Sequence, residues 1–284
     1  MSRACPHPYF AVFGQPIAHS LSPDIHSRFA AACGIDLRYS AIAAAPEQFS
    51  ALLARFRDEG GRGANITLPL KELAARLCQE LSPAAHLSGA VNTLVRREHG
   101  WLGDNTDGLG LCRDLANNLG VNLVGKRVLL LGAGGAARGI VPALFEEGVA
   151  GLVVANRSPE RAIALSYDLA ACGPIDACAL EALADAGRFS VLINATSAAR
   201  QGVALTLPAS LPSADAVAYD VSYGDAARPF LSWAASQGIG RRSDGLGMLV
   251  EQAAESFLRW HGVRPITAPV LADLRAAQTG AVPR

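Results

Sequence analysis

Short apolar runs alternate with helix-periodic segments along the first hundred residues. The apolar runs predict strands at 9–14, 38–43 and 63–68. Apolar residues at helical spacing, with Pro or Gly at the boundaries, predict helices at 23–33, 46–59 and 71–81. Two further runs around a polar turn predict a hairpin over 90–96 and 99–102. This alternation of strands and helices predicts an α/β domain.

The second half of the chain carries unbroken aliphatic runs, which are typical of parallel strands buried on both faces. Such strands are predicted at 128–131, 152–155, 191–194 and 217–221. Helices are predicted at 107–119, 159–171, 247–261 and 267–278. The pattern indicates a doubly wound, Rossmann-type domain. We therefore expect an α/β domain over 1–106 and a doubly wound domain over 107–246.

The composition restricts the kind of partner. With 284 residues the chain has room for two domains, and its 25 basic residues balance its 25 acidic ones. A neutral chain is a poor ligand for nucleic acid or an anionic membrane. The partner that we expect is a small-molecule substrate, and we expect a monomer or homodimer. The longest uncharged stretch, 4–23, contains four prolines and cannot cross a membrane. The six cysteines form no CxxC pair, the histidines have no metal-ligand spacing, and nothing directs export, so we expect a cytoplasmic protein without a metal.

A glycine-rich loop follows the first aliphatic run of the second half. Its sequence is Gly132-Ala133-Gly134-Gly135-Ala136-Ala137, which matches the pattern G-x-G-x-x-A. In a dinucleotide site the first glycine permits the tight turn, the second lets the backbone approach a pyrophosphate, and the alanine allows close packing of helix on strand. The alternative is a glycine-rich turn without a ligand. The strand before the loop and the helix after it favour a dinucleotide site.

The end of the next predicted strand bears on the choice of cofactor. It reads Asn156-Arg157-Ser158, and no Asp or Glu stands where an NAD enzyme keeps one for the ribose hydroxyl. Arg157, together with Arg161 one helical turn later, can instead bind a 2′-phosphate. The alternative is that both arginines belong to a solvated helix start. The sequence favours NADP over NAD.

Polar residues at strand ends of the first domain are candidates for the chemistry. Ser20 and Ser22 precede a predicted helix and can bind a carboxylate there, although an ordinary N-cap would also explain Ser22. Lys71 follows the turn at Pro69 and can transfer a proton, although a surface cation is the simpler interpretation. Asp107 starts a helix and so has a dipole explanation as well.

The order of these motifs over nearly the whole chain resembles the shikimate dehydrogenase family. The matching segments are Phe13-Gly14, Pro16-Ile17-Ala18-His19-Ser20-Leu21-Ser22-Pro23, Asn65-Ile66-Thr67, Lys71, Gly89-Ala90-Val91-Asn92-Thr93-Leu94, Asp104-Asn105-Thr106-Asp107-Gly108, the glycine loop, Asn156-Arg157-Ser158, Asn194-Ala195-Thr196-Ser197, Asp220 with Tyr223, and Asp244-Gly245-Leu246-Gly247-Met248 with Gln252. Three positions depart from the family pattern: Leu70, Val221 and Ser82-Pro83.

The resemblance implies reversible hydride transfer between NADPH and 3-dehydroshikimate, in the biosynthesis of aromatic amino acids. It implies that Lys71 and Asp107 form the catalytic pair and that Ser20 and Ser22 hold the substrate carboxylate. It assigns the substrate hydroxyls to Thr67, Asn92, Tyr223 and Gln252, and the nicotinamide side to Thr196, Val221 and Gly245. The first domain, 1–106, would then bind the substrate and carry the catalytic pair, and the second, 107–246, would bind NADP. The closing helices, 247–284, would return to the first domain. Two alternatives stay open: a paralogue with low or broader activity, such as a quinate/shikimate dehydrogenase that uses NAD, and a non-catalytic dinucleotide sensor.

Overall fold

The computed structural model of the chain describes residues 8–198 and 205–279. The chain divides into two compact units. The first unit comprises Met1–Gly110 and Leu249–Arg284, and the second comprises Leu111–Met248. Both divisions fall within helices, in α5 (Asp107–Arg113) and in α9 (Leu246–His261).

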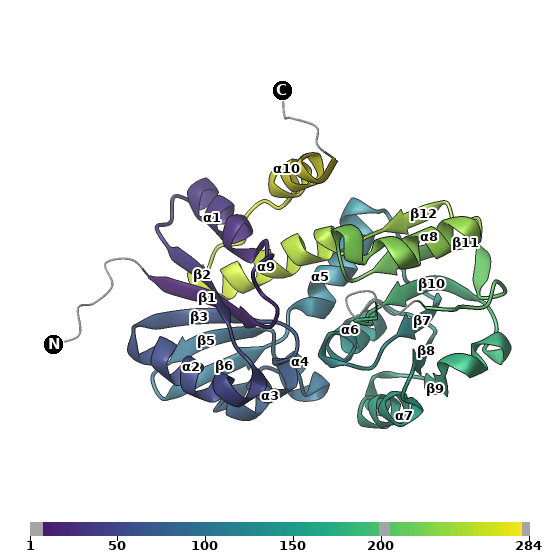
Figure 1. The fold of residues 1–284 in the computed structure, drawn as a ribbon, viewed down its shortest axis with the longest axis horizontal. Helices are drawn as coiled ribbons and strands as arrows, with labels where there is room; N and C mark the ends of the chain where they lie inside the picture. Colours follow the sequence, from purple (N-terminus) through teal and green to yellow (C-terminus); the bar gives the residue numbers. More distant parts are fainter. Residues whose placement is uncertain (1–7, 199–204, 280–284) are drawn as a thin grey trace. The chain divides into compact units, whose positions relative to one another are not determined.

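The first unit is built on a mixed six-stranded sheet in the order β2-β1-β3-β5-β6-β4 (Figure 1). Its strands are β1 (Tyr9–Gly14), β2 (Arg38–Ala43), β3 (Gly61–Ile66), β4 (Glu80–Leu81), β5 (Thr93–Arg97) and β6 (Gly100–Asp104). Its remaining helices are α1 (Ser22–Cys33), α2 (Pro46–Asp58), α3 (Lys71–Leu77), α4 (Pro83–Ser88) and α10 (Ala268–Thr279). Strands β1, β2 and β3 pair in parallel, whereas β5 is antiparallel to both β3 and β6. Every residue of β1 is buried, as expected for a strand with parallel neighbours on both sides.

The segment 71–81 differs from the prediction of one continuous helix. Helix α3 ends at Leu77, and Glu80–Leu81 forms the short strand β4, which pairs in parallel with β6. Cys78 at the end of the helix is extended, with ψ of 142°, so the chain leaves the helix there. The prediction was wrong because a pairing with residues about twenty positions later outweighs a local helical pattern. Helix α4, which was not predicted from the sequence, follows β4 and is capped by the Ser82 hydroxyl.

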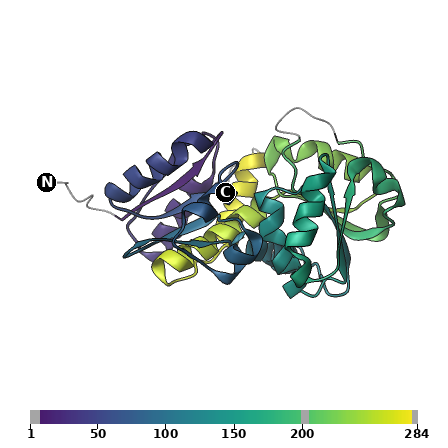
Figure 2. The same ribbon diagram turned by 90° about the horizontal axis from the view of Figure 1, so that it is seen from below.

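The closing helices α9 and α10 return to the first unit, as predicted from the sequence (Figure 2). Trp260 of α9 donates its indole N–H to the carbonyl of Leu94 at 2.9 Å. A Cβ at Gly63 would lie 2.3 Å from the same indole nitrogen, so the glycine leaves room for the ring. Helix α10 contacts α1 through an ion pair between Asp273 and Arg28.

His26 of α1 is completely buried in this unit and should make stability depend on pH. The pKa of His26 is lowered from 6.5 to about 3, chiefly by burial. The hydrogen bond to Asn65 raises this pKa, and the nearby His261 lowers it further. Since the folded protein holds His26 neutral while the unfolded chain protonates it near pH 6.5, this contribution to stability is complete above pH 6.5 and declines as the pH falls toward 3.

The free energy of unfolding should fall by about 1.4 kcal/mol for each pH unit below 6.5. Urea unfolding at several pH values should show this slope in the wild type and a shallower one in His26→Gln, which cannot titrate. His99→Gln, in the exposed hairpin turn, is the control and should keep the wild-type slope. Equal slopes in all three proteins would contradict the prediction.

The second unit contains an all-parallel sheet in the order β12-β11-β10-β7-β8-β9, which is the strand order of a Rossmann fold. The strands are β7 (Arg127–Leu131), β8 (Gly151–Asn156), β9 (Ile175–Ala179), β10 (Phe189–Asn194), β11 (Pro212–Asp220) and β12 (Arg241–Ser243). The helices are α6 (Gly135–Glu146), α7 (Pro159–Asp168) and α8 (Arg228–Ser236), with 3-10 turns at Ala170–Cys172, Leu180–Asp185 and Gly224–Ala226. The predicted fold class is therefore confirmed.

Successive side chains along the strands of this sheet alternate between two hydrophobic cores, one on each face. Val128 and Leu130 point to the core that contains α6 and α7, whereas Leu129 and Leu131 point to the core that contains α8. Burial on both faces explains why these runs are apolar without interruption. Strands β9 and β12 were not predicted because neither is an apolar run, and β12 is only three residues long.

The helix predicted over 107–119 changes type inside its span. It is α-helical to Arg113 and continues as a π-helical turn over Asp114–Asn118. The Asp114 side chain is buried and accepts hydrogen bonds from Tyr219 at 2.6 Å and Asn118 at 2.8 Å. A Cβ at Gly247 would lie 2.0 Å from an Asp114 oxygen, so the carboxylate occupies the place that a side chain at Gly247 would need.

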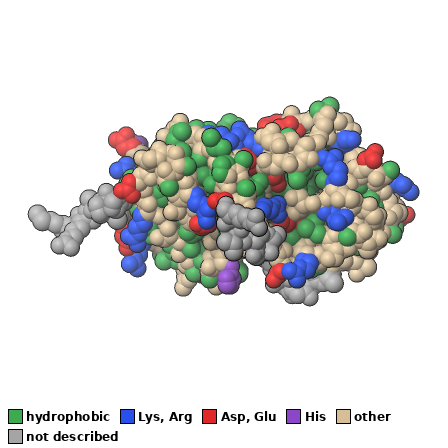
Figure 3. Space-filling model, turned by 90° about the horizontal axis from the view of Figure 1, so that it is seen from above, with side chains coloured by type: hydrophobic (Ala, Val, Ile, Leu, Met, Phe, Trp, Pro, Cys, Tyr) green, Lys and Arg blue, Asp and Glu red, His purple; other side chains and the backbone are tan. Residues whose placement is uncertain are grey.

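The surface agrees with the neutral composition. On the face drawn in Figure 3, acidic and basic side chains are interspersed, and neither sign forms a continuous area. No helix in the described part of the chain is long and apolar enough to cross a membrane.

Candidate active site

The first unit holds a buried ion pair between Lys71 and Asp107. The Lys71 ammonium donates to Asp107 Oδ2, and the two side chains are only 14% and 5% exposed. Lys71 is the first residue of α3 and Asp107 the first of α5, so each follows a turn at a strand end. The sequence alone allowed Lys71 to be a surface cation. Its low exposure and its ion pair with Asp107 show that it is not. It carries a transferable proton beside a carboxylate that fixes its position.

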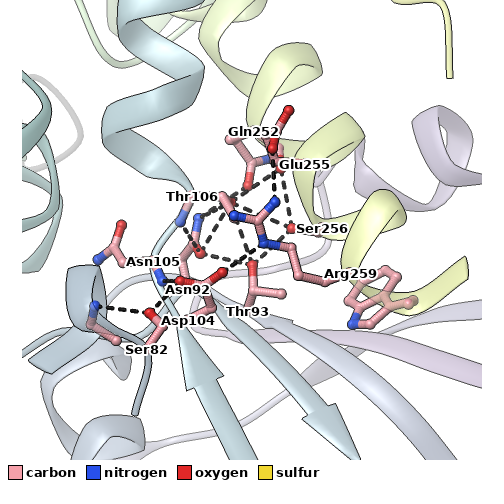
Figure 4. A network of polar contacts seen from close by, with 12 residues as sticks. Ser82, Asn92, Thr93, Asp104, Asn105, Thr106, Gln252, Glu255, Ser256 and Arg259 are labelled. Atoms are coloured by element: carbon pink, nitrogen blue, oxygen red, sulfur yellow. Dashed lines mark hydrogen bonds and ion pairs between the residues drawn. The ribbon is translucent and has the colours of Figure 1, made fainter. Parts of the chain in front are cut away.

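Asn92 orients the other oxygen of this carboxylate. Its amide nitrogen donates to Asp107 Oδ1 at 2.9 Å. It also donates to Gln252 Oε1 at 3.2 Å (Figure 4). Its carbonyl oxygen accepts from the Thr106 backbone N–H at 2.9 Å and from the Thr93 hydroxyl at 2.8 Å. Asn92 is 2% exposed, and these partners hold its amide in one orientation. The structure thus brings together Lys71, Asp107, Asn92 and Gln252.

Asn65 lies in the same unit but is used internally. Its carbonyl oxygen accepts from Tyr39 at 2.7 Å and from His26 at 3.1 Å, and its nitrogen donates to Ser256 at 2.8 Å. Burial raises the pKa of Tyr39, so its hydroxyl stays a donor. With both ends of the amide engaged, Asn65 ties α9 to the end of β3.

The two serines and Thr67 lie on neighbouring turns. Ser22 is buried and shares a hydrogen bond with Tyr39, while its backbone N–H donates to the Ser20 hydroxyl at 3.3 Å. The N-cap of α1 is Leu21, and Ser22 is the first residue of the helix, so the N-cap explanation of Ser22 was wrong. Thr67 is half-buried and its backbone N–H donates to the carbonyl of Phe13.

The glycine loop of the second unit has the geometry that a dinucleotide requires. Gly132 has φ of +104°, and a Cβ there would lie 2.9 Å from the carbonyl oxygen of Ala195. Gly134 precedes α6 with an extended backbone, and a Cβ there would meet no atom within 4 Å. Ala137 is completely buried against the sheet. Space over Gly134 at a helix N-terminus therefore fits a pyrophosphate, whereas Gly132 is required by the turn itself. Gly135 and Ala136 begin α6, and Ala133 is buried within the loop.

The turn after β8 presents two basic side chains. Arg157 and Arg161 are both exposed, and neither has a carboxylate partner among the residues that the structure describes. Asn156 donates to the carbonyl of Ser158 at 3.0 Å and so shapes the turn. Two unneutralised guanidinium groups one helical turn apart suit a phosphate monoester.

The remaining predicted cofactor residues surround the ends of β10 and β11. Asn194 accepts from the backbone N–H and the hydroxyl of Thr196 and donates to the buried Asp220 at 2.7 Å. A Cβ at Gly245 would lie 2.3 Å from the carbonyl oxygen of Val221, which explains the glycine. Tyr223, which is half-buried, follows β11 in this second unit.

Ser256 of the first unit was not singled out from the sequence, whereas Thr106 belongs to a segment that was. Thr106 and Ser256 are completely buried and take part in the hydrogen bonds around Asn92 and Asn65. Ser256 stands four residues after Gln252, on the same side of α9, and this spacing was the available signal.

A Rossmann-type sheet with a glycine loop after its first strand, together with a buried lysine and carboxylate, defines the class of nicotinamide-dependent dehydrogenases. Models of the shikimate dehydrogenase substrate-binding domain, of shikimate/quinate 5-dehydrogenase and of the shikimate 5′-dehydrogenase C-terminal domain match residues 12–94, 114–206 and 245–275. The chain belongs to the shikimate dehydrogenase family, and the resemblance drawn from its motifs is confirmed.

Individual relatives agree over almost their whole length. The chain is 55% identical to a shikimate dehydrogenase (NADP(+)) of Xanthomonas oryzae pv. oryzae, over 95% of this chain and 96% of that protein. It is 51% identical to the corresponding protein of Dechloromonas aromatica, over 94% and 97%. A solved structure of shikimate 5-dehydrogenase from Thermus thermophilus, in complex with NADP(H) and shikimate, matches with a TM-score of 0.80 and 34% identity, over 97% and 100%. An Ael1 enzyme from Pseudomonas putida matches with a TM-score of 0.85 and 43% identity, over 94% and 98%.

Proposed function

We propose that this protein catalyses the reversible, NADP-dependent reduction of 3-dehydroshikimate to shikimate in aromatic amino-acid biosynthesis. The observation that carries the proposal is the buried Lys71–Asp107 pair, oriented by Asn92, in a chain of this family. The names of the relatives and the Thermus complex support both the substrate and the cofactor. A sensor would not need a proton donor held in this way.

The mechanism follows from the charge that the reaction creates. When bound, NADPH supplies the hydride, which leaves negative charge on the carbonyl oxygen of the substrate. Lys71 stands as general acid for that oxygen and as general base in the reverse direction. Asp107 keeps the ammonium in place, and Asn92 keeps Asp107 in place through the bond to Oδ1.

Binding of the substrate is assigned to the polar side chains that the family resemblance names. In our proposal Ser20 and Ser22 hold the carboxylate, and Thr67, Asn92, Gln252 and Tyr223 hold the ring hydroxyls. The Asn92 and Gln252 side chains already contact each other at 3.2 Å, so they can share one ligand hydroxyl.

Binding of the cofactor is assigned to the second unit. The open space over Gly134 would hold the pyrophosphate, Arg157 and Arg161 with Asn156 and Ser158 the adenosine phosphate, and Thr196, Val221 and Gly245 the nicotinamide side. We also propose that the protein acts in the cytoplasm, as a monomer or homodimer. The free state of all cysteines in the described part of the chain supports a reducing compartment.

The activity is tested by following the absorbance of reduced nicotinamide. The purified protein should reduce NADP in the presence of shikimate, with a much higher kcat/KM than with quinate or with NAD in place of NADP. If kcat/KM with quinate equalled that with shikimate, and kcat/KM with NAD equalled that with NADP, the protein would be the broader paralogue. Absence of activity with every pair, while NADP still binds, would support a sensor.

Gly132 and Gly134 of the loop make a sharper test of the cofactor site. Gly132→Ala forces a side chain into a left-handed conformation and against Ala195, so we expect a loss of about 1–3 kcal/mol in unfolding free energy. Gly134→Ala meets no protein atom and has an allowed backbone, so stability should stay near the wild type. The added methyl group of Gly134→Ala should nevertheless weaken NADP by about tenfold or more, since it occupies the proposed pyrophosphate space.

Urea unfolding of the free proteins and a fluorescence titration with NADP measure the two effects separately. Wild-type NADP affinity in Gly134→Ala would place the pyrophosphate elsewhere.

A further inference from the structure

An ionic network joins α9 to the strand end that leads to Asp107. Arg259 of α9 donates through Nε to Asp104 Oδ2 at 2.7 Å and through Nη1 to Glu255 Oε2 at 2.8 Å (Figure 4). Arg264 donates to the other oxygen of Glu255 at 2.7 Å and to Glu251 at 2.6 Å. The side chains of Glu251 and Glu255 are each 3% exposed, so their charges need these partners.

Two hydrogen-bonded routes lead from Asp104 to Asp107. In one, Asp104 Oδ1 accepts from the Asn105 backbone N–H at 2.8 Å, and Asn105 Oδ1 accepts from the Asp107 backbone N–H at 3.1 Å. In the other, the Asp104 carbonyl accepts from the Asn92 backbone N–H at 3.0 Å, and the Asn92 side chain donates to Asp107. The first route links the Asp104 carboxylate to the backbone of Asp107, and the second links the Asp104 backbone to the Asp107 side chain.

Arg259 is the group that fixes the Asp104 carboxylate from the side of α9. The Ser82 hydroxyl and the Asn105 N–H both bind Oδ1, which leaves Oδ2 to the guanidinium. Burial opposes the charge of Arg259, but its bonds to Asp104 and Glu255 outweigh burial and raise its pKa. Arg264 contacts neither Asp104 nor the 104–107 turn and therefore serves as a matched comparison.

We propose that Arg259 is a positioning residue for the reaction: through Asp104 it holds the 104–107 turn so that Asp107 keeps its orientation toward Lys71. The inference rests on the proposed function, because it concerns the rate of that reaction. It adds a residue of α9, 152 positions away from Asp107, to the groups on which turnover depends.

The experiment compares Arg259→Gln with Arg264→Gln. Both variants remove a partner of the buried Glu255, so both should lower the melting temperature. Arg259→Gln should also lower kcat with shikimate by about 10- to 100-fold, with KM for NADP unchanged, since displacement of a catalytic group by about 1 Å has such an effect. Arg264→Gln should keep kcat near the wild type. Arg259→Lys, which retains the charge, should recover part of the lost rate.

The route through Asp104 is tested by a double-mutant cycle. If Arg259 acts through Asp104, Asp104→Asn with Arg259→Gln should lose no more kcat than the worse of the two single variants. Multiplied losses would overturn this route. Equal kcat in Arg259→Gln and Arg264→Gln would overturn the proposal as a whole.

Amide hydrogen exchange gives a readout that needs no activity. In the cofactor-free protein the 104–107 peptide should exchange faster in Arg259→Gln than in the wild type, and at the wild-type rate in Arg264→Gln. If the wild type were inactive with shikimate, the proposed function would fail, and this measurement would still decide whether Arg259 holds the turn. Unchanged exchange in folded Arg259→Gln would overturn the inference.

Discussion

Replacing Lys71 with alanine is expected to lower kcat by about 10²- to 10⁴-fold while KM for shikimate stays within a few-fold of the wild type. The reason is that Lys71 supplies the proton for the developing oxyanion, whereas serine, threonine, asparagine and glutamine side chains carry the binding of the substrate. The lysine side chain is 14% exposed and its ammonium donates to Asp107. No other cation of the described first unit is paired with that carboxylate, so none stands ready to replace the lysine.

The control for this prediction is the other lysine of the chain. Lys126 lies in the second unit, just before β7, and its backbone carbonyl accepts from Ala150. Lys126→Ala should therefore retain the wild-type kcat. Steady-state kinetics in both directions measure the effect, and wild-type turnover in Lys71→Ala would remove the lysine from the mechanism.

Replacing Arg157 with aspartate is expected to raise KM for NADP by about 10- to 100-fold, because it removes charge-assisted hydrogen bonds worth roughly 1.5–3 kcal/mol and adds repulsion. KM for NAD should change little or fall, since a carboxylate in this turn can bind the ribose hydroxyl of NAD. The ratio of the two kcat/KM values, measured with shikimate saturating, reports the change directly. Arg161→Ala should show a smaller effect in the same direction.

Arg127→Ala provides the matched control for the loss of a guanidinium. Arg127 begins β7 and stacks over Phe189, whereas Arg157 follows the end of β8. Since β7 and β8 are parallel, the start of β7 and the end of β8 lie at opposite ends of the strands, and so do the two arginines. The Arg127→Ala protein should therefore keep the wild-type preference for NADP. An unchanged NADP preference in Arg157→Asp would refute the phosphate assignment.

The strands that were predicted well are those whose own residues decide their state. The buried aliphatic run ending at Leu131 and the alternating helix and strand signals before Gly60 depend on neighbours only a few positions away. The prediction failed at Glu80–Leu81, where pairing with β6 produces a strand from residues of helical pattern. A short strand in a polar segment is stabilised by its partner, and the partner is not visible in the segment itself.

The sequence by itself determined the two α/β units, the glycine loop, the absence of an acid at the end of β8 and, by its motifs, the family. These features are local, since each depends on residue types and spacings within one element or turn. Only the tertiary structure decided which polar groups are paired. Asn92 meets Gln252 across 160 positions, Asp104 meets Arg259 across 155, and Asn65 is fully engaged by Tyr39, His26 and Ser256. Hydrogen bonds and ion pairs need atoms within about 3 Å, and only the folded chain brings residues so distant in sequence to that separation.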